Sequence, residues 1–553
     1  MTHPMFARHQ AMLDRAVQAV TERGYWSPFS ENPSPKVYGE NAMAEGRAAF
    51  DAYCGTDFQL DQPGCTGTAG SERSPYGVPM NIRYPRCSGE ALIEASKAAR
   101  DSLQALGAEG RVGALLEALV RLNQRSFEIA HAVMFTTGQG WMMAFQAGAA
   151  HAQDRALEAV AYAWREMSAI PAEAHWEKPQ GKNPALVLKK RYEIVGRGVA
   201  LVIGCGTFPT WNTYPGLFAA LATGNPVIVK PHRNAILPAA ITVRVLREVL
   251  AEAGADPNAV LLAVDDSREL TRFLATNKAV KSIDFTGSNT FGNWLIENCR
   301  QAQVYAELAG VNNVVIESTD DYKGMLRNIA FTLSLYSGQM CTTTQAILVP
   351  AGGIDTDQGH KSYDDVAADL GRSIDKLLAD PAIASAVLGC IQSSDTLGRL
   401  DEASRWGEVV LASQPVAHPD YPEATVRTPV LLKCDAADEA AYMEERFGPI
   451  AFVVRTPDAA AAIALSERIT TEHGALTVGA YTAKPEFAQQ VIAATQHAGV
   501  ALSLNLTGGV YVNQSAAYSD YHGTGANPSA NASYSDSAFV ANRFRVIQHR
   551  FAV

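Results

Sequence analysis

The sequence has no excess of positive charge, no metal-type cysteine spacing and no long apolar run. Its 46 lysines and arginines stand against 57 aspartates and glutamates, and the net charge of −11 disfavours nucleic acid or an anionic membrane as a partner. No Cys-x-x-Cys pair occurs, so no metal site is expected. No apolar stretch is long enough to span a bilayer, and the first residues lack the apolar core of a signal peptide.

The eight cysteines are scattered along a chain of 553 residues. Disulfide frameworks are typical of short secreted domains, so none is expected here, and free thiols indicate a cytoplasmic location. The chain is also too long for a single hydrophobic core, which predicts two or three domains.

Helix-like and strand-like segments alternate over most of the chain. Residues 10–24 are predicted to form a short helix, residues 25–88 an irregular wrap rich in Pro, Gly, Ser and Tyr, and residues 89–167 long amphipathic helices. Buried strands then alternate with helices, which predicts a parallel, doubly wound sheet, and a second α/β series runs from about 307 to 512. The first buried strands are expected at Val199–Ile203, Pro226–Lys230, Val260–Val264 and Ser282–Phe285.

Two further regions carry alternating apolar and charged residues. Residues 178–197 are predicted to form a pair of exposed strands, and Arg543–Phe551 one more strand. An exposed alternating strand needs a partner, which another subunit can supply. These segments therefore predict a bridging element and a homodimer or larger homo-oligomer.

Cys341 and Glu307 are the first candidate catalytic residues. Cys341 lies between a helix-like segment and a strand-like run, and it is followed by three threonines. A thiolate can attack an electrophilic carbonyl, and a carboxylate such as Glu307 can later activate water against the acyl-enzyme. The alternative is a buried cysteine that serves only as a small hydrophobe.

Three loops after predicted strands suggest a dinucleotide site. Gly204-Cys205-Gly206 allows a close backbone approach to a ligand, although a simple tight turn explains it equally well. The next loop offers bases and no acid, which suits the 2′-phosphate of NADP, or it is a solvated basic loop. The third could hold a pyrophosphate, or it is a capped helix start. The residues concerned are Lys230, His232 and Arg233 in the second loop and Gly287, Ser288 and Gly292 in the third.

Four motifs occur in an order and spacing that resemble the aldehyde dehydrogenase superfamily over roughly residues 89–515. They are Gly287-Ser288-x-x-x-Gly292, Glu307-Leu308-x-Gly310, Gly338-Gln339-x-Cys341 and Glu444-Glu445-x-Phe447-Gly448-Pro449. The Tyr/Pro-rich N-terminal segment and the stretch from Thr207 to Pro215 resemble a narrower group, the ring-cleavage aldehyde dehydrogenases of aerobic phenylacetate breakdown (the PaaN group).

The resemblance implies a role for each matching residue. Cys341 is the expected nucleophile and Glu307 the expected general base. Glu445 is expected on the nicotinamide ribose and Phe447 beside the ring. The remaining cofactor-binding residues are expected to be Lys230, His232, Arg233, Gly287, Ser288, Gly292 and Leu308.

The sequence also departs from the family pattern. The family usually has Asn directly before Phe-Pro as an oxyanion donor, and Thr207 holds that position here. The Thr207 hydroxyl is therefore expected to be a catalytic group that stabilises the oxyanion, together with the backbone N–H of Cys341 or Thr342. Asn212 is not expected to replace it, because five helical residues turn it about 140° away. Arg233 stands where the family usually has a Glu that grips the ribose of NAD, which favours NADP over NAD. The closing segment around Tyr521 and His522 departs as well.

Together these features predict an α/β fold with two doubly wound domains, for cofactor and catalysis, and a small β bridging element. The expected parts are 1–177 (N-terminal segment and helices of the cofactor-binding domain), 178–197 (bridging strands), 198–306 (nucleotide-binding domain), 307–529 (catalytic domain) and 530–553 (C-terminal bridging strand). The expected reaction is NAD(P)-dependent oxidation of a small-molecule aldehyde to an acid, with a CoA-linked semialdehyde implied by the narrower resemblance. The alternatives are a CoA-acylating reductase and a catalytically silent binding protein.

Overall fold

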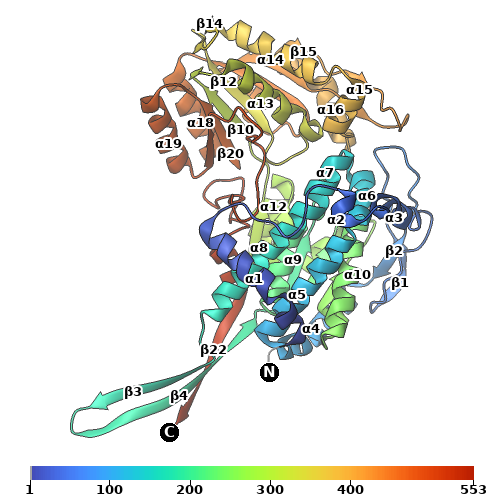
Figure 1. The fold of residues 1–553 in the computed structure, drawn as a ribbon, viewed down its shortest axis with the longest axis vertical. Coiled ribbons are helices and arrows are strands. Elements are labelled where there is room, and N and C mark those ends of the chain that lie inside the picture. The colour runs from blue at the N-terminus through green and yellow to red at the C-terminus, as the bar shows by residue number, and fades with distance from the viewer. Residues whose placement is uncertain (1–2) are drawn as a thin grey trace.

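The computed structural model, which describes residues 3–553, confirms the predicted α/β architecture. One parallel sheet lies in the part predicted to bind nucleotide (the nucleotide-binding sheet), and a larger mixed sheet lies in the part predicted to be catalytic (the catalytic sheet). A thin three-stranded arm projects away from both (Figure 1). Within residues 3–553, no helix is both long enough and apolar enough to cross a bilayer.

The nucleotide-binding sheet has the order β7-β6-β5-β8-β9, with every neighbouring pair parallel. Its central strand is a run of β-branched and aliphatic residues that is buried on both faces, as expected for a sheet covered by helices on each side. The strands are β5 (Val199–Ile203), β6 (Val227–Lys230), β7 (Val260–Leu262), β8 (Val280–Thr286) and β9 (Gln303–Glu307), and the connecting helices are α9 (Thr213–Ala222), α10 (Leu237–Glu252), α11 (Glu269–Thr276) and α12 (Asn289–Asn298).

The catalytic sheet has the order β15-β18-β19-β12-β10-β20-β21, and only its edge strand β15 runs antiparallel to its neighbour. The strands are β10 (Asn312–Ile316), β12 (Thr344–Pro350), β15 (Glu408–Leu411), β18 (Val430–Asp435), β19 (Ile450–Thr456), β20 (Thr477–Tyr481) and β21 (Ala501–Leu504). Its main helices are α13 (Tyr322–Ser334), α14 (Tyr363–Leu377), α15 (Pro381–Leu388), α16 (Ser394–Glu402), α18 (Ala459–His473) and α19 (Pro485–Ala498).

The N-terminal region is more ordered than the sequence predicts. The expected helix at 10–24 is longer and starts earlier, because Pro4 suits the first turn of a helix. The elements are α1 (Pro4–Glu22), α2 (Pro35–Tyr38), α3 (Ala42–Asp51), β1 (Cys65–Ala69), β2 (Tyr84–Cys87), α4 (Gly89–Ala105), α5 (Gly107–Gln124), α6 (Ser126–Thr137), α7 (Trp141–Phe145) and α8 (His151–Ser168).

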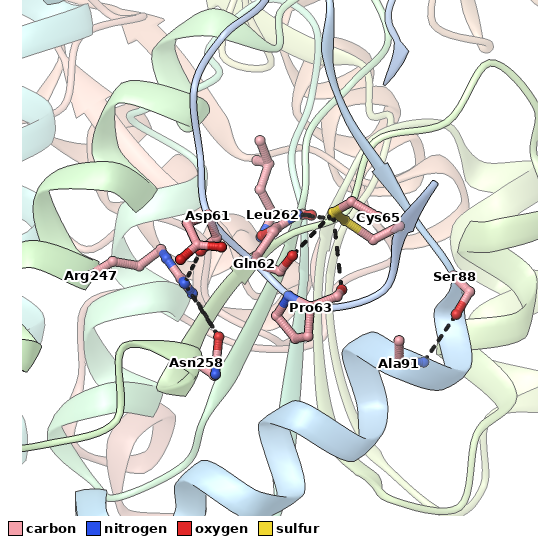
Figure 2. The surroundings of a disulfide bond; sticks show 10 residues. Asp61, Gln62, Pro63, Cys65, Ser88, Ala91, Arg247, Asn258 and Leu262 are labelled. Atoms are coloured by element: carbon pink, nitrogen blue, oxygen red, sulfur yellow. Dashed lines mark hydrogen bonds between the residues drawn. A yellow bond between two sulfur atoms is a disulfide. The ribbon is translucent and has the colours of Figure 1, made fainter. Parts of the chain in front are cut away.

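The expectation that all cysteines are free is wrong for one pair. Cys65 and Cys87 face each other in the antiparallel pair β1–β2 and form a disulfide (Figure 2). Their separation of 22 residues gives no hint of this, because only the strand register brings them together. Beside the disulfide, the amide of Gln62 bonds both the N–H and the C=O of Leu262, so the N-terminal wrap caps the free edge of β7 (Figure 2).

The arm consists of β3 (Glu173–Gln180), β4 (Asn183–Gly196) and β22 (Phe544–Ala552), all antiparallel. The first strand begins five residues before the predicted boundary of 178. A buried ion pair between Arg543 and Asp284 fastens the base of the arm to the nucleotide-binding sheet, with Nη1 2.9 Å from Oδ2. Several apolar side chains of the arm are exposed, namely Trp176, Leu186, Val546, Ile547 and Phe551.

Candidate active site

Three segments that are distant in the sequence meet between the two sheets. Glu307 ends β9, Cys341 lies in the turn before β12, and His522 belongs to the closing segment after β21. One side-chain oxygen of Glu307, the Cys341 sulfur and one ring nitrogen of His522 all lie within 4.8 Å of one another. The sequence predicted the first two residues as a pair, and it did not predict the third.

The turn that presents Cys341 has a strained backbone. Tyr336, Ser337 and Gly338 have φ angles of 52°, 48° and 63°, in the left-handed region that residues with a Cβ rarely adopt. Side-chain hydrogen bonds compensate, since the Tyr336 hydroxyl donates to the carbonyl of Thr137 at 2.7 Å. The amide of Asn312 donates to the carbonyl of Cys341 at 2.8 Å. The loop is therefore held rigidly, as a site for covalent chemistry requires.

Glu307 is 1% exposed, and its Oε2 accepts hydrogen bonds from the side chains of His522 and Asn212. His522 Nε2 lies 3.0 Å from this oxygen, and the Asn212 amide donates to it at 3.2 Å. Burial raises the pKa of Glu307, but the attraction of His522 and the hydrogen bonds from His522, Cys341 and Asn212 outweigh it, so the net pKa is lowered. The carboxyl group is therefore ionised at neutral pH and can act as a base.

Cys341 is partly exposed, as a nucleophile must be to reach its substrate. Burial of the thiol and the neighbouring Glu307 carboxylate raise the pKa of Cys341 well above its ordinary value. The resting thiol is thus protonated, and Glu307 is the nearest ionised group that can take its proton.

The helical geometry assumed for Asn212 is wrong. Helix α9 begins only at Thr213, so turns and not helix connect Thr207 to Asn212, and the 140° rotation does not apply. Asn212 is 8% exposed and contacts Glu307, whereas the Thr207 hydroxyl points to Cys205 Sγ at 4.0 Å. The Trp211-Asn212 pair at the start of α9 was the sequence signal that could have identified this residue.

A π-helical turn, η1 (Gln146–Ala150), supports this segment from the side. The Thr210 hydroxyl donates to the carbonyl of Gly148 in this turn at 2.7 Å. π-helical turns widen a helix locally and often occur at functional sites. This one anchors the turn that carries Asn212.

The loop Gly287–Gly292, which the sequence predicts to hold a pyrophosphate, has features that suit a bound cofactor. Ser288 is the N-cap of α12, yet its side chain makes no capping hydrogen bond within the described chain, so the hydroxyl is available to a ligand. A Cβ at Gly292 would lie 2.1 Å from Leu308 Cδ2, so a larger residue would require the Leu308 side chain to move. Gly287 donates its N–H to the carbonyl of Glu307 at 3.0 Å, which ties the loop to the catalytic strand.

An acidic residue, Asp265, lies beside Lys230 in the loop region predicted to meet the adenosine ribose. The sequence analysis did not identify it. Lys230 Nζ lies 3.1 Å from Asp265 Oδ1, and both side chains are largely buried. Arg233 is exposed beside them. His232 packs against Gly206, and burial lowers its pKa to about 4, so it is neutral and carries no charge toward a phosphate.

Glu445 and Phe447 line a hollow together with Gly310, Thr343 and Met340, the residue before Cys341. Burial of the carboxyl group raises the pKa of Glu445 to about 7, although the N–H of Gly310 offsets part of this. Arg399 donates to the carbonyl of Phe447 at 2.9 Å and fixes the loop. Both residues therefore lie near Cys341, where the resemblance expects the nicotinamide end of the cofactor.

A family model described as the aldehyde dehydrogenase family matches residues 74–532. The chain belongs to the aldehyde dehydrogenase family. It is an oxidoreductase that acts on aldehydes.

Individual relatives agree with this family. The crystal structure of an NAD-dependent aldehyde dehydrogenase from Burkholderia multivorans is 56% identical, with a TM-score of 0.99 and full coverage of both chains. A vanillin dehydrogenase from Pseudomonas fluorescens is 26% identical over 66% of this chain and 72% of its own. A 3,4-dehydroadipyl-CoA semialdehyde dehydrogenase from Aromatoleum evansii is 25% identical over 53% of this chain and 58% of its own.

Proposed function

We propose that this aldehyde dehydrogenase forms a thioester on Cys341 and hydrolyses it with water that Glu307 activates. Cys341 loses its thiol proton to solvent, and the sulfur adds to the aldehyde carbon to give a thiohemiacetal. When bound, the nicotinamide supplies the acceptor for the hydride of this intermediate. Glu307 then removes a proton from water, which attacks the thioester and releases the acid. The close approach of Glu307 to Cys341 carries this proposal.

Asn212 is the side chain that we assign to the oxyanion, in place of Thr207. An amide has two N–H donors, and only one is used on Glu307. The second is free for the oxygen of the thiohemiacetal, with the backbone N–H of Cys341 or Thr342 as the other donor.

Asn212→Ala is expected to lower kcat by about 10²- to 10³-fold, the scale on which loss of one oxyanion donor acts. Thr207→Ala is the matched control, because this hydroxyl faces Cys205, and its kcat should stay within about twofold of wild type. Steady-state kinetics on one simple aldehyde measures both. A large loss in Thr207→Ala with little loss in Asn212→Ala would reverse the assignment.

The cofactor is proposed to be a nicotinamide dinucleotide bound by Lys230, Ser288 and Glu445. The Burkholderia multivorans relative supports NAD. The preference for NADP rested on a loop without an acid, and Asp265 supplies an acid near Lys230. What still favours NADP is the exposed Arg233, which is free to reach a 2′-phosphate.

Arg233→Glu tests that contact. If Arg233 binds the 2′-phosphate, the variant should lose about 10- to 100-fold in kcat/KM with NADP and little with NAD, because a charge-assisted hydrogen bond is replaced by repulsion. Arg327→Glu, an exposed arginine of α13, is the control for the change in net charge. The measure is the ratio of kcat/KM with NADP to kcat/KM with NAD. If this ratio is the same in wild type and Arg233→Glu, Arg233 does not contact the 2′-phosphate.

The substrate is proposed to be a CoA-linked semialdehyde of aromatic degradation. The motifs of the PaaN group and the Aromatoleum evansii relative support this class. Oxidation of a panel of free and CoA-linked semialdehydes tests it, with kcat/KM as the measure. A higher value for the free aldehydes would contradict the CoA-linked assignment. Release of the acyl group to added CoA instead of water would favour the CoA-acylating alternative.

We also propose a cytoplasmic homo-oligomer. Six of the eight cysteines are free in the described chain, which suits a reducing compartment, whereas the Cys65–Cys87 bond is the one feature that does not. The exposed apolar residues of the arm support a subunit contact there.

A further inference from the structure

His522 is a buried histidine in direct contact with the proposed general base. Its side chain is 4% exposed and that of Glu307 is 1% exposed, and 215 residues separate the two in the sequence. Histidine Nε2 and carboxylate Oε2 are 3.0 Å apart, the length of a good hydrogen bond. Glu307 is the base of the proposed reaction, but His522 has no role in it so far.

The imidazole is held in place from several sides. The backbone N–H of His522 donates to Ser535 Oγ at 2.9 Å, and its carbonyl accepts from the N–H of Tyr534 at 3.0 Å. The indole of Trp211 packs edge-on against the ring, with centroids 4.6 Å apart and planes at 76°. His522 is thus as rigidly placed as the carboxylate that it contacts.

Arg155, on helix α8, contacts both Trp211 and the segment that precedes His522. Its guanidinium carbon lies 5.2 Å from the Trp211 ring centroid, at cation–π distance. The same guanidinium donates to Ser515 Oγ at 2.6 Å and to the carbonyl of Asp520 at 3.1 Å, so it also ties down the segment that leads to His522. A buried side chain on α8 therefore fixes the position of both Trp211 and His522.

The hydrogen bonds divide the two oxygens of Glu307 into separate roles. Oε2 has two partners, His522 and Asn212, whereas no N–H or O–H group among residues 3–553 reaches the buried Oε1. An oxygen that already accepts two hydrogen bonds is a poor proton acceptor, and the unpartnered one is a good acceptor. Oε1 is consequently the oxygen that can take a proton from the thiol or from water.

We propose that His522 is a positioning residue that fixes Glu307 with Oε1 as its basic atom and keeps the carboxylate ionised inside the buried site. This inference rests on the proposed function, because it deepens the role of Glu307 within it. Without His522, the carboxylate would be buried with the Asn212 amide as its only fixed partner. Burial of that kind favours the protonated carboxyl group, which cannot act as a base.

A cofactor-independent reaction tests the proposal. Para-nitrophenyl acetate, an activated ester, acylates a reactive thiol with a burst of nitrophenolate, and the rate after the burst reports hydrolysis of the acetyl-enzyme. The burst amplitude counts intact sites, so a variant that misfolds is recognised by a lost burst. The pH dependence of the second phase reports the ionisation of the base.

His522→Phe keeps a ring against Trp211 but removes the hydrogen bond. The hydrolysis rate at neutral pH should fall by about 10- to 100-fold. In the pH–rate profile, the pH below which hydrolysis is lost should rise by about one to two units, because a base works only above its own pKa and burial raises the pKa of Glu307. His522→Gln keeps an N–H donor and should restore most of the neutral rate. The other titratable groups that interact with Glu307, and whose contribution is the same in both variants, are Cys341, Cys205, Glu445 and Tyr534.

The outcomes distinguish failure of the role proposed for His522 from failure of the proposed function. A normal burst in His522→Phe, followed by hydrolysis with the rate and acid limb of wild type, would overturn the role of His522 and leave the proposed function intact. The absence of any burst in the wild-type enzyme would instead overturn the proposed function itself, and with it this inference. Equal defects in His522→Phe and His522→Gln would contradict the assignment of an N–H donor as the essential feature.

Discussion

Cys341→Ala is expected to lower aldehyde oxidation by about four or more orders of magnitude, since covalent enzymes lose activity on this scale when the nucleophile is removed. Cofactor binding, measured by fluorescence or calorimetry, should remain, because the alanine variant leaves Lys230, Ser288 and Glu445 untouched. The effect is this large because Cys341 is the thiol that the strained turn presents to Glu307 and His522.

Cys54→Ser is the matched control for the loss of a thiol. Cys54 is also a partly exposed free cysteine, but its sulfur faces the carbonyl of Phe50 in the N-terminal region. This variant should oxidise aldehyde at the wild-type rate. Turnover by Cys341→Ala at anything near that rate would eliminate the covalent mechanism.

Glu307→Gln is expected to separate the two halves of the reaction. Hydrolysis should slow by about 10²- to 10⁴-fold, the range over which general bases contribute, while a single burst of reduced cofactor remains. In the wild type, hydrolysis should continue to pH values below the ordinary carboxyl range, because the pKa of Glu307 is lowered and the base stays ionised above it. Burst kinetics and the pH profile of the slow phase measure these effects.

The control for Glu307→Gln is Glu317→Gln. Glu317 is another carboxylate with a lowered pKa, held by Lys484 and Thr482 beside β10. Its replacement should leave both phases unchanged. A Glu307→Gln enzyme without any burst would indicate that Glu307 acts before hydride transfer, as the base for the Cys341 thiol.

The architecture was predictable because its signals are local. Strands buried on both faces are continuous aliphatic runs, and their alternation with helices indicates a parallel sheet without any knowledge of contacts. The exposed arm was equally visible in its alternating pattern. The start of α1 was missed because Pro4 was not taken as the first residue of a helix. The antiparallel pair β1–β2 was missed because sequence separation and composition do not encode which strands pair.

The site was predictable only in the parts that lie within motifs. Cys341, Glu307 and the Gly287–Gly292 loop stand in short patterns with recognisable spacing. His522 and Asp265 reach the site through long-range folding, from the closing segment and from the end of β7, and no local pattern marks them. Asn212 was not predicted to lie at the site for a different reason, because a helix was assumed where the chain makes turns before α9.

The covalent step can be tested directly on the Glu307→Gln enzyme. After one burst with aldehyde and cofactor, the protein is denatured in acid, digested and analysed by tandem mass spectrometry. The account predicts one acyl group per chain, attached to Cys341 and absent when Cys341 is also replaced by alanine. An acyl group on another residue, or a completed burst that leaves no acyl group on the protein, would contradict it.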